Sequence, residues 1–143
     1  MIYLDTSVLG AMFFREPGAA ALFARLESVR KEVLLISAWS LTEMASVAGI
    51  KRRTGALDVE TCREALGHFQ RFASTQLRTT EVEPADFRTA AVLIETPAGR
   101  GALRAGDALH VAIARRLQAR MASLDRRLCN AIDALGVPGF ELV

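Results

Sequence analysis

The chain has 143 residues, of which 51% are hydrophobic and 24% charged, and its formal net charge is +2. This length favours one domain, residues 1–143, and allows a buried core without disulfide bonds. The near-average composition excludes intrinsic disorder, whereas so small a net charge does not by itself indicate a class of partner.

No apolar run approaches the roughly 18 residues that a membrane span requires. The first residues lack the basic start and apolar stretch of a signal peptide, so we expect a cytoplasmic protein without membrane contact. Cys62 and Cys129 are too few and too isolated for a zinc motif or a disulfide framework. We expect both to be small buried thiols.

Short strand-like runs alternate with segments of helical periodicity along the whole chain. The first half of the chain is predicted to contain a strand at Ile2–Leu4, helices at Val8–Phe14 and from Pro17 to about Arg30, and a strand at Val33–Ile36. A helix then opens at Ser37 or Ser40 and is broken by Gly55, and a further helix is capped by Asp58 and ends near Thr75. The second half is predicted to contain a strand at Arg78–Val82, helices from Pro84 to about Glu95 and from Ala105 to Leu117, a strand at Met121–Leu124, a helix to about Leu135, and a short fifth strand at Phe140–Val143.

This alternation determines the expected fold class. Val33–Ile36 is continuously apolar, as a strand buried on both faces should be. Strands that alternate with helices predict a parallel sheet covered on both faces. We therefore expect an α/β protein of three layers, with a central, mostly parallel sheet of about five strands flanked by helices.

Four acidic residues stand out by their positions in these elements. Asp5 and Asp125 each follow a predicted strand by one residue, and Glu43 and Asp107 lie in the first turns of predicted helices. Sites in open parallel sheets form beyond the carboxyl ends of the strands, where the strand order reverses. If the first and fourth strands are neighbours, the four carboxylates converge, and Gly106 leaves room for close approach.

Clustered carboxylates repel one another, and a divalent cation removes that penalty. Carboxylate and water oxygens select Mg²⁺ or Mn²⁺. Two such ions about 3.5–4 Å apart can hold a scissile phosphate and deprotonate a water. The pattern therefore indicates a metal-dependent nuclease, although each acid taken alone is more often a helix cap or a solvated charge. Ser7 and Ser123 are polar neighbours that could support the site.

The same residues resemble the motifs of the PIN-domain ribonucleases. The resemblance rests on four segments in the family's order and spacing: Ile2–Leu9, Ser40–Met44, Ala105–Ala112, and Ser123–Leu128 followed by Ala134–Val137. Length and single-domain form are most similar to the VapC-type toxins of bacterial toxin–antitoxin pairs.

The resemblance implies a Mg²⁺- or Mn²⁺-dependent endoribonuclease that cleaves RNA, often tRNA or rRNA. It also implies a homodimer that is inhibited by a cognate antitoxin. Asp5, Glu43 and Asp107 carry over as the core metal ligands, and Asp125 as the more variable fourth. Because water attacks the phosphorus, the expected products carry a 5′-phosphate and a 3′-hydroxyl.

Basic residues near these motifs are candidates for contacts with RNA phosphates. Arg126 and Arg127 adjoin Asp125, and Arg100 and Arg104 flank the loop before Asp107. His110, one turn beyond Asp107, is interpreted as a buried or hydrogen-bonded structural histidine rather than a proton shuttle.

Three alternatives stand beside the ribonuclease. A phosphate-accepting receiver domain shares the fold class, but the strand at Arg78–Val82 is followed by Glu83-Pro84 rather than a phosphoacceptor aspartate. A non-catalytic RNA-binding module has no reason to keep repelling carboxylates together. A PIN-like nuclease with a housekeeping role on RNA or DNA would use the same ions, and the sequence leaves it open.

Overall fold

The computed structural model describes all residues, 1–143, and confirms an α/β fold with a parallel sheet. The four strands are β1 (Ile2–Leu4), β2 (Leu34–Ser37), β3 (Arg78–Thr80) and β4 (Arg120–Ala122). Their order is β3-β2-β1-β4, and every neighbouring pair is parallel. The first and fourth strands are therefore neighbours, which the convergence of the acids required.

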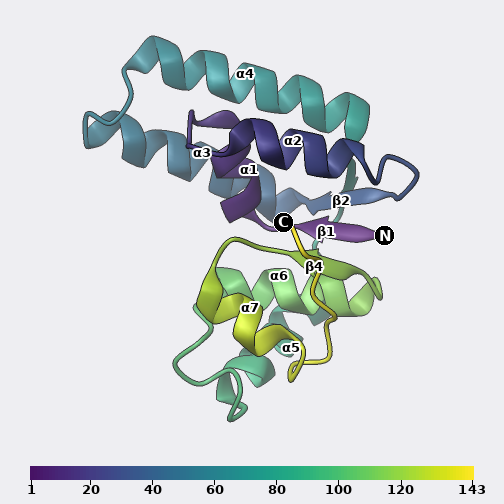
Figure 1. Ribbon diagram of the computed structural model, residues 1–143. Helices are drawn as coiled ribbons and strands as arrows, with labels where there is room; N and C mark the ends of the chain where they lie inside the picture. Colours follow the sequence, from purple (N-terminus) through teal and green to yellow (C-terminus); the bar gives the residue numbers. More distant parts are fainter.

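Helices cover both faces of this sheet and make three layers (Figure 1). They are α1 (Thr6–Phe13), α2 (Ala19–Glu27), α3 (Ala38–Arg53), α4 (Val59–Gln76), α5 (Pro84–Glu95), α6 (Ala105–Arg116) and α7 (Arg126–Ile132). Alternate residues of β1 supply the two cores: Ile2 and Leu4 pack with the α1–α4 side, and Tyr3 packs with the α5–α7 side. No helix is both long and apolar enough to cross a bilayer.

Helix starts differ from the expected ones where a side chain or a backbone conformation determines them. Asp5 is the N-cap of α1, so that helix begins at Thr6 rather than at the expected Val8. The second helix begins after Gly18, whose φ of 89° is left-handed, and not in the turn containing Pro17. Ser37 caps α3 in a reciprocal arrangement with Ser40.

The fifth strand expected at Phe140–Val143 does not form. A single parallel bridge joins Met121 to Gly139, and the chain makes no further ladder. Pro138, which has no N–H to donate, only accepts from the Met121 N–H at 2.9 Å. The Phe140 N–H donates to the Met121 carbonyl at 2.8 Å, and its ring packs in the core, with the guanidinium of Arg25 4.6 Å from the ring centroid. The sheet therefore has four strands rather than five.

The two cysteines occupy different environments. Cys62 is buried, as expected, but Cys129 is exposed, so the expectation for Cys129 is wrong. The Cys129 thiol lies on the outer part of α7 and donates to the Ser123 carbonyl at 3.3 Å.

A partly buried ion pair joins α5 to α6. The Asp86 carboxylate, 2% exposed, accepts from Arg116 Nε at 2.8 Å and Nη2 at 2.9 Å, and from the Glu83 N–H at 2.8 Å. Burial alone would raise the Asp86 pKa, but these donors outweigh it and hold the pKa below its ordinary value of 3.8. The folded protein therefore stabilises the ionised form of Asp86.

We expect Asp86→Asn to lower the free energy of unfolding by about 2 kcal/mol at neutral pH, because Arg116 loses a charged acceptor. A lowered pKa contributes stability above pH 3.8, and that contribution is lost as the pH falls through the folded-state value. The difference between variant and wild type should therefore shrink in acid. Urea denaturation across this pH range measures it. Glu95→Gln, on the same helix and exposed, is the control and should change stability by less than about 0.5 kcal/mol.

Candidate active site

One cavity of about 570 Å³ opens at the carboxyl edge of the sheet, and all four predicted acids line it. Asp5 follows β1, Glu43 is on α3, Asp107 is in the first turn of α6, and Asp125 precedes α7. Four segments far apart in the sequence thus deliver carboxylates to one place.

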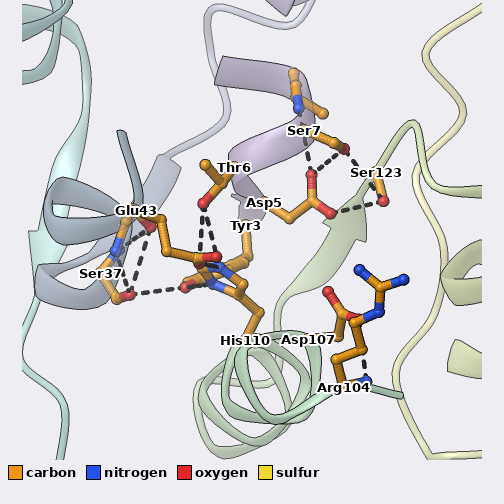
Figure 2. Close-up of polar contacts among 12 residues, drawn as sticks. Tyr3, Asp5, Thr6, Ser7, Ser37, Glu43, Arg104, Asp107, His110 and Ser123 are labelled. Carbon is orange, nitrogen blue, oxygen red and sulfur yellow. Dashed lines mark hydrogen bonds and ion pairs between the residues drawn. The ribbon is translucent and has the colours of Figure 1, made fainter. Parts of the chain in front are cut away.

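Asp5 is the most buried of the four, at 4% exposed. Its Oδ1 accepts from Ser7 Oγ at 2.5 Å and from the Val8 N–H at 3.3 Å, and its Oδ2 accepts from Ser123 Oγ at 2.7 Å (Figure 2). Burial raises the Asp5 pKa above its ordinary value, and the Ser7 and Ser123 hydroxyls oppose that rise without cancelling it. The site therefore holds a carboxylate whose charge is incompletely compensated.

Ser7 and Ser123 also tie the ends of two strands together. Ser7 Oγ accepts from the Leu124 N–H at 2.9 Å, and Ser123 Oγ accepts from the Asp125 N–H at 3.0 Å. Both serines contact the Asp5 carboxylate directly. The structure therefore places these two residues where supporting polar groups were expected.

Glu43 is held by a buried polar chain that runs back to the centre of the sheet. Its Oε1 contacts His110 Nε2 and accepts from Thr6 Oγ1 at 3.1 Å. His110 Nδ1 lies 2.6 Å from the Tyr3 hydroxyl, which donates to Ser37 Oγ at 2.9 Å. Burial raises the Tyr3 pKa well above its ordinary value, so this hydroxyl stays protonated. This series of hydrogen bonds fixes the position of the Glu43 carboxylate.

His110 is buried and hydrogen-bonded, which confirms the structural interpretation of this residue. Sequence reasoning missed its contact with Glu43, and it missed Tyr3 and Thr6 altogether. The available signals were that Thr6 follows Asp5 and that His110 follows Asp107 by three residues. Neither signal identifies a partner on a different helix.

Asp107 lies in the first turn of α6, and Asp125 is the N-cap of α7. Asp107 Oδ2 accepts from the Arg104 N–H at 3.1 Å, and Asp125 Oδ1 accepts from the Arg127 N–H at 2.8 Å and the Leu128 N–H at 3.3 Å. The other oxygen of each carboxylate has no hydrogen bond, and the same is true of Glu43 Oε2. Three oxygens of the predicted ligands are therefore free to bind another group.

This donor set fits a hard divalent cation. All four side chains offer carboxylate oxygens, and the cavity contributes no thiol that would favour a soft metal. No three His, Cys, Asp or Glu side chains yet lie close enough together to hold an ion. Binding therefore requires the carboxylates to draw together.

None of the four predicted RNA-contacting arginines lines this cavity. Arg100 and Arg127 line a separate hollow of about 420 Å³, and Arg126 is exposed at the start of α7. Arg104 adjoins Asp107 through its backbone (Figure 2). Among the lysines and arginines, only Lys51 lines the acidic cavity.

Comparison with family models matches residues 2–133 to the family described as PIN domain. A comparison with curated proteins finds no match. Among solved structures, FitAB bound to an IR36 DNA fragment is 19% identical, with 99% of this chain and 95% of that chain covered and a TM-score of 0.76.

Two further structures carry the VapC name. Mycobacterium tuberculosis VapC20, described as a sarcin–ricin-loop-cleaving toxin, is 17% identical, with 99% of each chain covered and a TM-score of 0.69. VapBC2 from Rickettsia felis, bound to a DNA fragment from its promoter, is 17% identical, with 87% of this chain and 88% of that chain covered and a TM-score of 0.63. At such identities these likenesses show a shared fold.

We expect Asp5→Asn to raise the free energy of unfolding by on the order of 1 kcal/mol at neutral pH in EDTA, because it removes a poorly compensated buried charge. The Asp5 pKa is raised above 3.8, so wild-type stability falls as the pH rises from 3.8 through the folded-state value. The variant lacks this fall, and its advantage should grow over the same window. Thermal and urea unfolding at several pH values measure it.

The matched control for this charge change is Asp133→Asn, because Asp133 is exposed. Its stability should follow that of the wild type at every pH. An Asp5→Asn protein that is less stable than wild type across the whole range would show that the carboxylate is fully compensated.

Proposed function

The chain belongs to the PIN-domain family, and on that premise we propose that it is a Mg²⁺- or Mn²⁺-dependent endoribonuclease that acts as the toxin of a type II toxin–antitoxin pair. The observation that carries the nuclease proposal is the meeting of Asp5, Glu43, Asp107 and Asp125 in one cavity. RNA is the proposed substrate, with tRNA or rRNA as the expected class, and the cytoplasm is the proposed place of action.

Each acid has a proposed role. Asp5, Glu43 and Asp107 hold the cation, and Asp125 completes or tunes its site. A bound Mg²⁺ or Mn²⁺ would supply a water of lowered pKa and neutralise charge on the phosphate. Asp5 is positioned by Ser7 and Ser123, and Glu43 by His110. Asp125 Oδ2, which has no protein partner, is the proposed acceptor for a proton from the attacking water.

The proposed toxin role is supported by the solved structures that share this fold. Solved structures that share it include a toxin named for cleaving the sarcin–ricin loop and two complexes of paired proteins on DNA. We extend to this chain an antitoxin partner that inhibits it and a homodimeric assembly. Both are carried over from the resemblance to VapC-type toxins, and co-purification and light scattering test them.

The nuclease proposal predicts metal-dependent cleavage of a mixed structured-RNA pool, abolished by EDTA. Asp107→Asn should lower the rate by more than the 10–100-fold typical of residues that only support metal ligands. The products should carry a 5′-phosphate and a 3′-hydroxyl, because water is the nucleophile. Gel analysis with end-group labelling measures both, with Asp133→Asn as the control that should cleave normally.

A 2′,3′-cyclic phosphate product would exclude the proposed mechanism. A folded protein that binds Mn²⁺ but cleaves DNA and not RNA would move the assignment to a DNA nuclease. A folded protein that neither cleaves nor binds a cation would leave a non-catalytic RNA-binding module.

A further inference from the structure

One buried donor beside the acid cluster has no partner. The indole Nε1 of Trp39 is buried and makes no hydrogen bond, and no other buried side-chain nitrogen or oxygen is left in that state. Buried tryptophan N–H groups usually find an acceptor, and leaving one unpaired costs about 1–3 kcal/mol. A phenylalanine would fill the same space without that cost, so the N–H calls for an explanation.

A free acceptor close to this donor is the carboxylate of Glu43. Trp39 and Glu43 are four residues apart on α3 and therefore lie on the same face of that helix. Both approach Gly106 on α6: a Cβ there would lie 3.5 Å from Trp39 Nε1 and 3.3 Å from Glu43 Oε2. The unpartnered donor and an unpartnered oxygen thus converge on one point, and the absence of a side chain at Gly106 leaves that point open.

We propose that the Trp39 indole N–H donates to Glu43 Oε2 when a cation draws the carboxylates together, and so positions Glu43 as a ligand. His110 and Thr6 already hold the other oxygen, Oε1. Donors on both oxygens fix the orientation of the carboxylate plane, as outer partners of metal ligands commonly do. Trp39 is thus a positioning residue, and this inference rests on the proposed cation site.

The test uses the fact that Trp39 is the only tryptophan in the chain. Its indole N–H therefore gives one side-chain resonance in a ¹⁵N-labelled sample, and Mg²⁺, which is diamagnetic, does not broaden it. We expect a downfield shift and slower solvent exchange of that proton as Mg²⁺ saturates the site. Calorimetry measures saturation independently. Trp39→Phe, which keeps the ring packing, should weaken Mg²⁺ binding about 10-fold.

Gly106→Ala provides a second variant that leaves the indole intact. Its methyl group would occupy the point where the two groups converge, so Mg²⁺ binding should weaken there as well. An indole proton that does not move at calorimetric saturation overturns the role of Trp39 while leaving the cation site in place. Complete failure to bind Mg²⁺ or Mn²⁺ overturns both this inference and the cation dependence of the proposed function.

A second observation concerns the far end of the same cavity, where a lysine is neutralised by an acid. Lys51 Nζ donates to Glu16 Oε1 at 2.9 Å, and both residues line the cavity. The five carboxylates that line it are Asp5, Glu16, Glu43, Asp107 and Asp125. Lys51 is therefore the one permanent positive charge available there to a phosphate.

The position of Lys51 is fixed relative to the acids. Glu43, Val47 and Lys51 are spaced by four residues along α3, so they form one stripe that spans two turns, or about 12 Å. Gly10, on α1, lines the same cavity, and a Cβ there would meet nothing within 4 Å. One cavity therefore contains both the acids and Lys51.

We infer that Lys51 binds a backbone phosphate of an RNA nucleotide flanking the scissile bond, and that Glu16 competes with this phosphate for the lysine. The Lys51–Glu16 pair is partly exposed, with side chains 23% and 44% accessible, and such pairs contribute only about 0–1 kcal/mol. A phosphate can therefore displace Glu16. This inference also rests on the proposed ribonuclease function.

The two partners should have opposite effects on RNA affinity. Anisotropy of a labelled single-stranded RNA is measured with Ca²⁺ in place of Mg²⁺, with gels to verify that the RNA stays intact. Lys51→Gln should weaken binding several-fold and reduce the salt dependence by about one phosphate contact. Glu16→Gln should strengthen binding. Lys31→Gln is the control, because Lys31 is the only other lysine and lies exposed before β2, at the opposite edge of the sheet.

Equal effects of Lys51→Gln and Lys31→Gln on RNA affinity would show that Lys51 contributes only to the overall positive charge of the protein, and would overturn this inference. Weaker RNA binding by Glu16→Gln would show that Glu16 does not compete with the phosphate for Lys51. Because the proposed function is tested separately, by cleavage in Mg²⁺, its failure would be seen in the wild type and not in these ratios.

Discussion

The burial of one carboxylate, that of Asp5, determines much of this structure. The strand that delivers it, β1, has neighbours on both sides, and all three of its residues are 0% exposed. An ionised group in such a place is unfavourable unless it is hydrogen-bonded. Two of its three donors, Ser7 and the Val8 N–H, are local, and the third, Ser123, comes from the end of β4, 118 residues later. Satisfying Asp5 thus fastens the end of β4 beside the end of β1.

Helix capping then links the stability of the fold to the position of the site. Asp5, Asp107 and Asp125 all accept backbone N–H groups at the start of a helix, where acidic side chains are favoured by the helix dipole. Asp5 and Asp125 are N-caps, Asp107 accepts the N–H of the N-cap residue Arg104, and each of these contacts holds a carboxylate at the cavity. Because Asp107 and Asp125 use only one oxygen for this purpose, the second oxygen of each stays available. A cap and a ligand are therefore compatible roles for the same side chain here.

Sequence patterns predicted the features that depend on local chemistry. The parallel sheet, most of the helices and the meeting of the four acids followed from apolar runs, helical spacing and the position of each acid at the end of an element. The contacts that cross elements were out of reach. Tyr3 and His110 are 107 residues apart, and nothing local in either segment indicates that they touch. The fifth strand is reduced to one bridge between Met121 and Gly139, and the apolar residues of Phe140–Val143 gave no local sign that pairing would stop there.

The charge of the cavity couples its two proposed ligands. At an effective dielectric constant near 20, two like charges 4 Å apart repel by about 4 kcal/mol, so a phosphodiester entering among five carboxylates is strongly disfavoured. Lys51 offsets little of this while it is paired with Glu16. In the proposed enzyme, a divalent cation that offsets part of this negative charge would favour the binding of RNA as well as its cleavage. Binding free energies are reciprocal, so the proposal implies that RNA raises the affinity of the site for the cation by the same factor by which the cation raises its affinity for RNA.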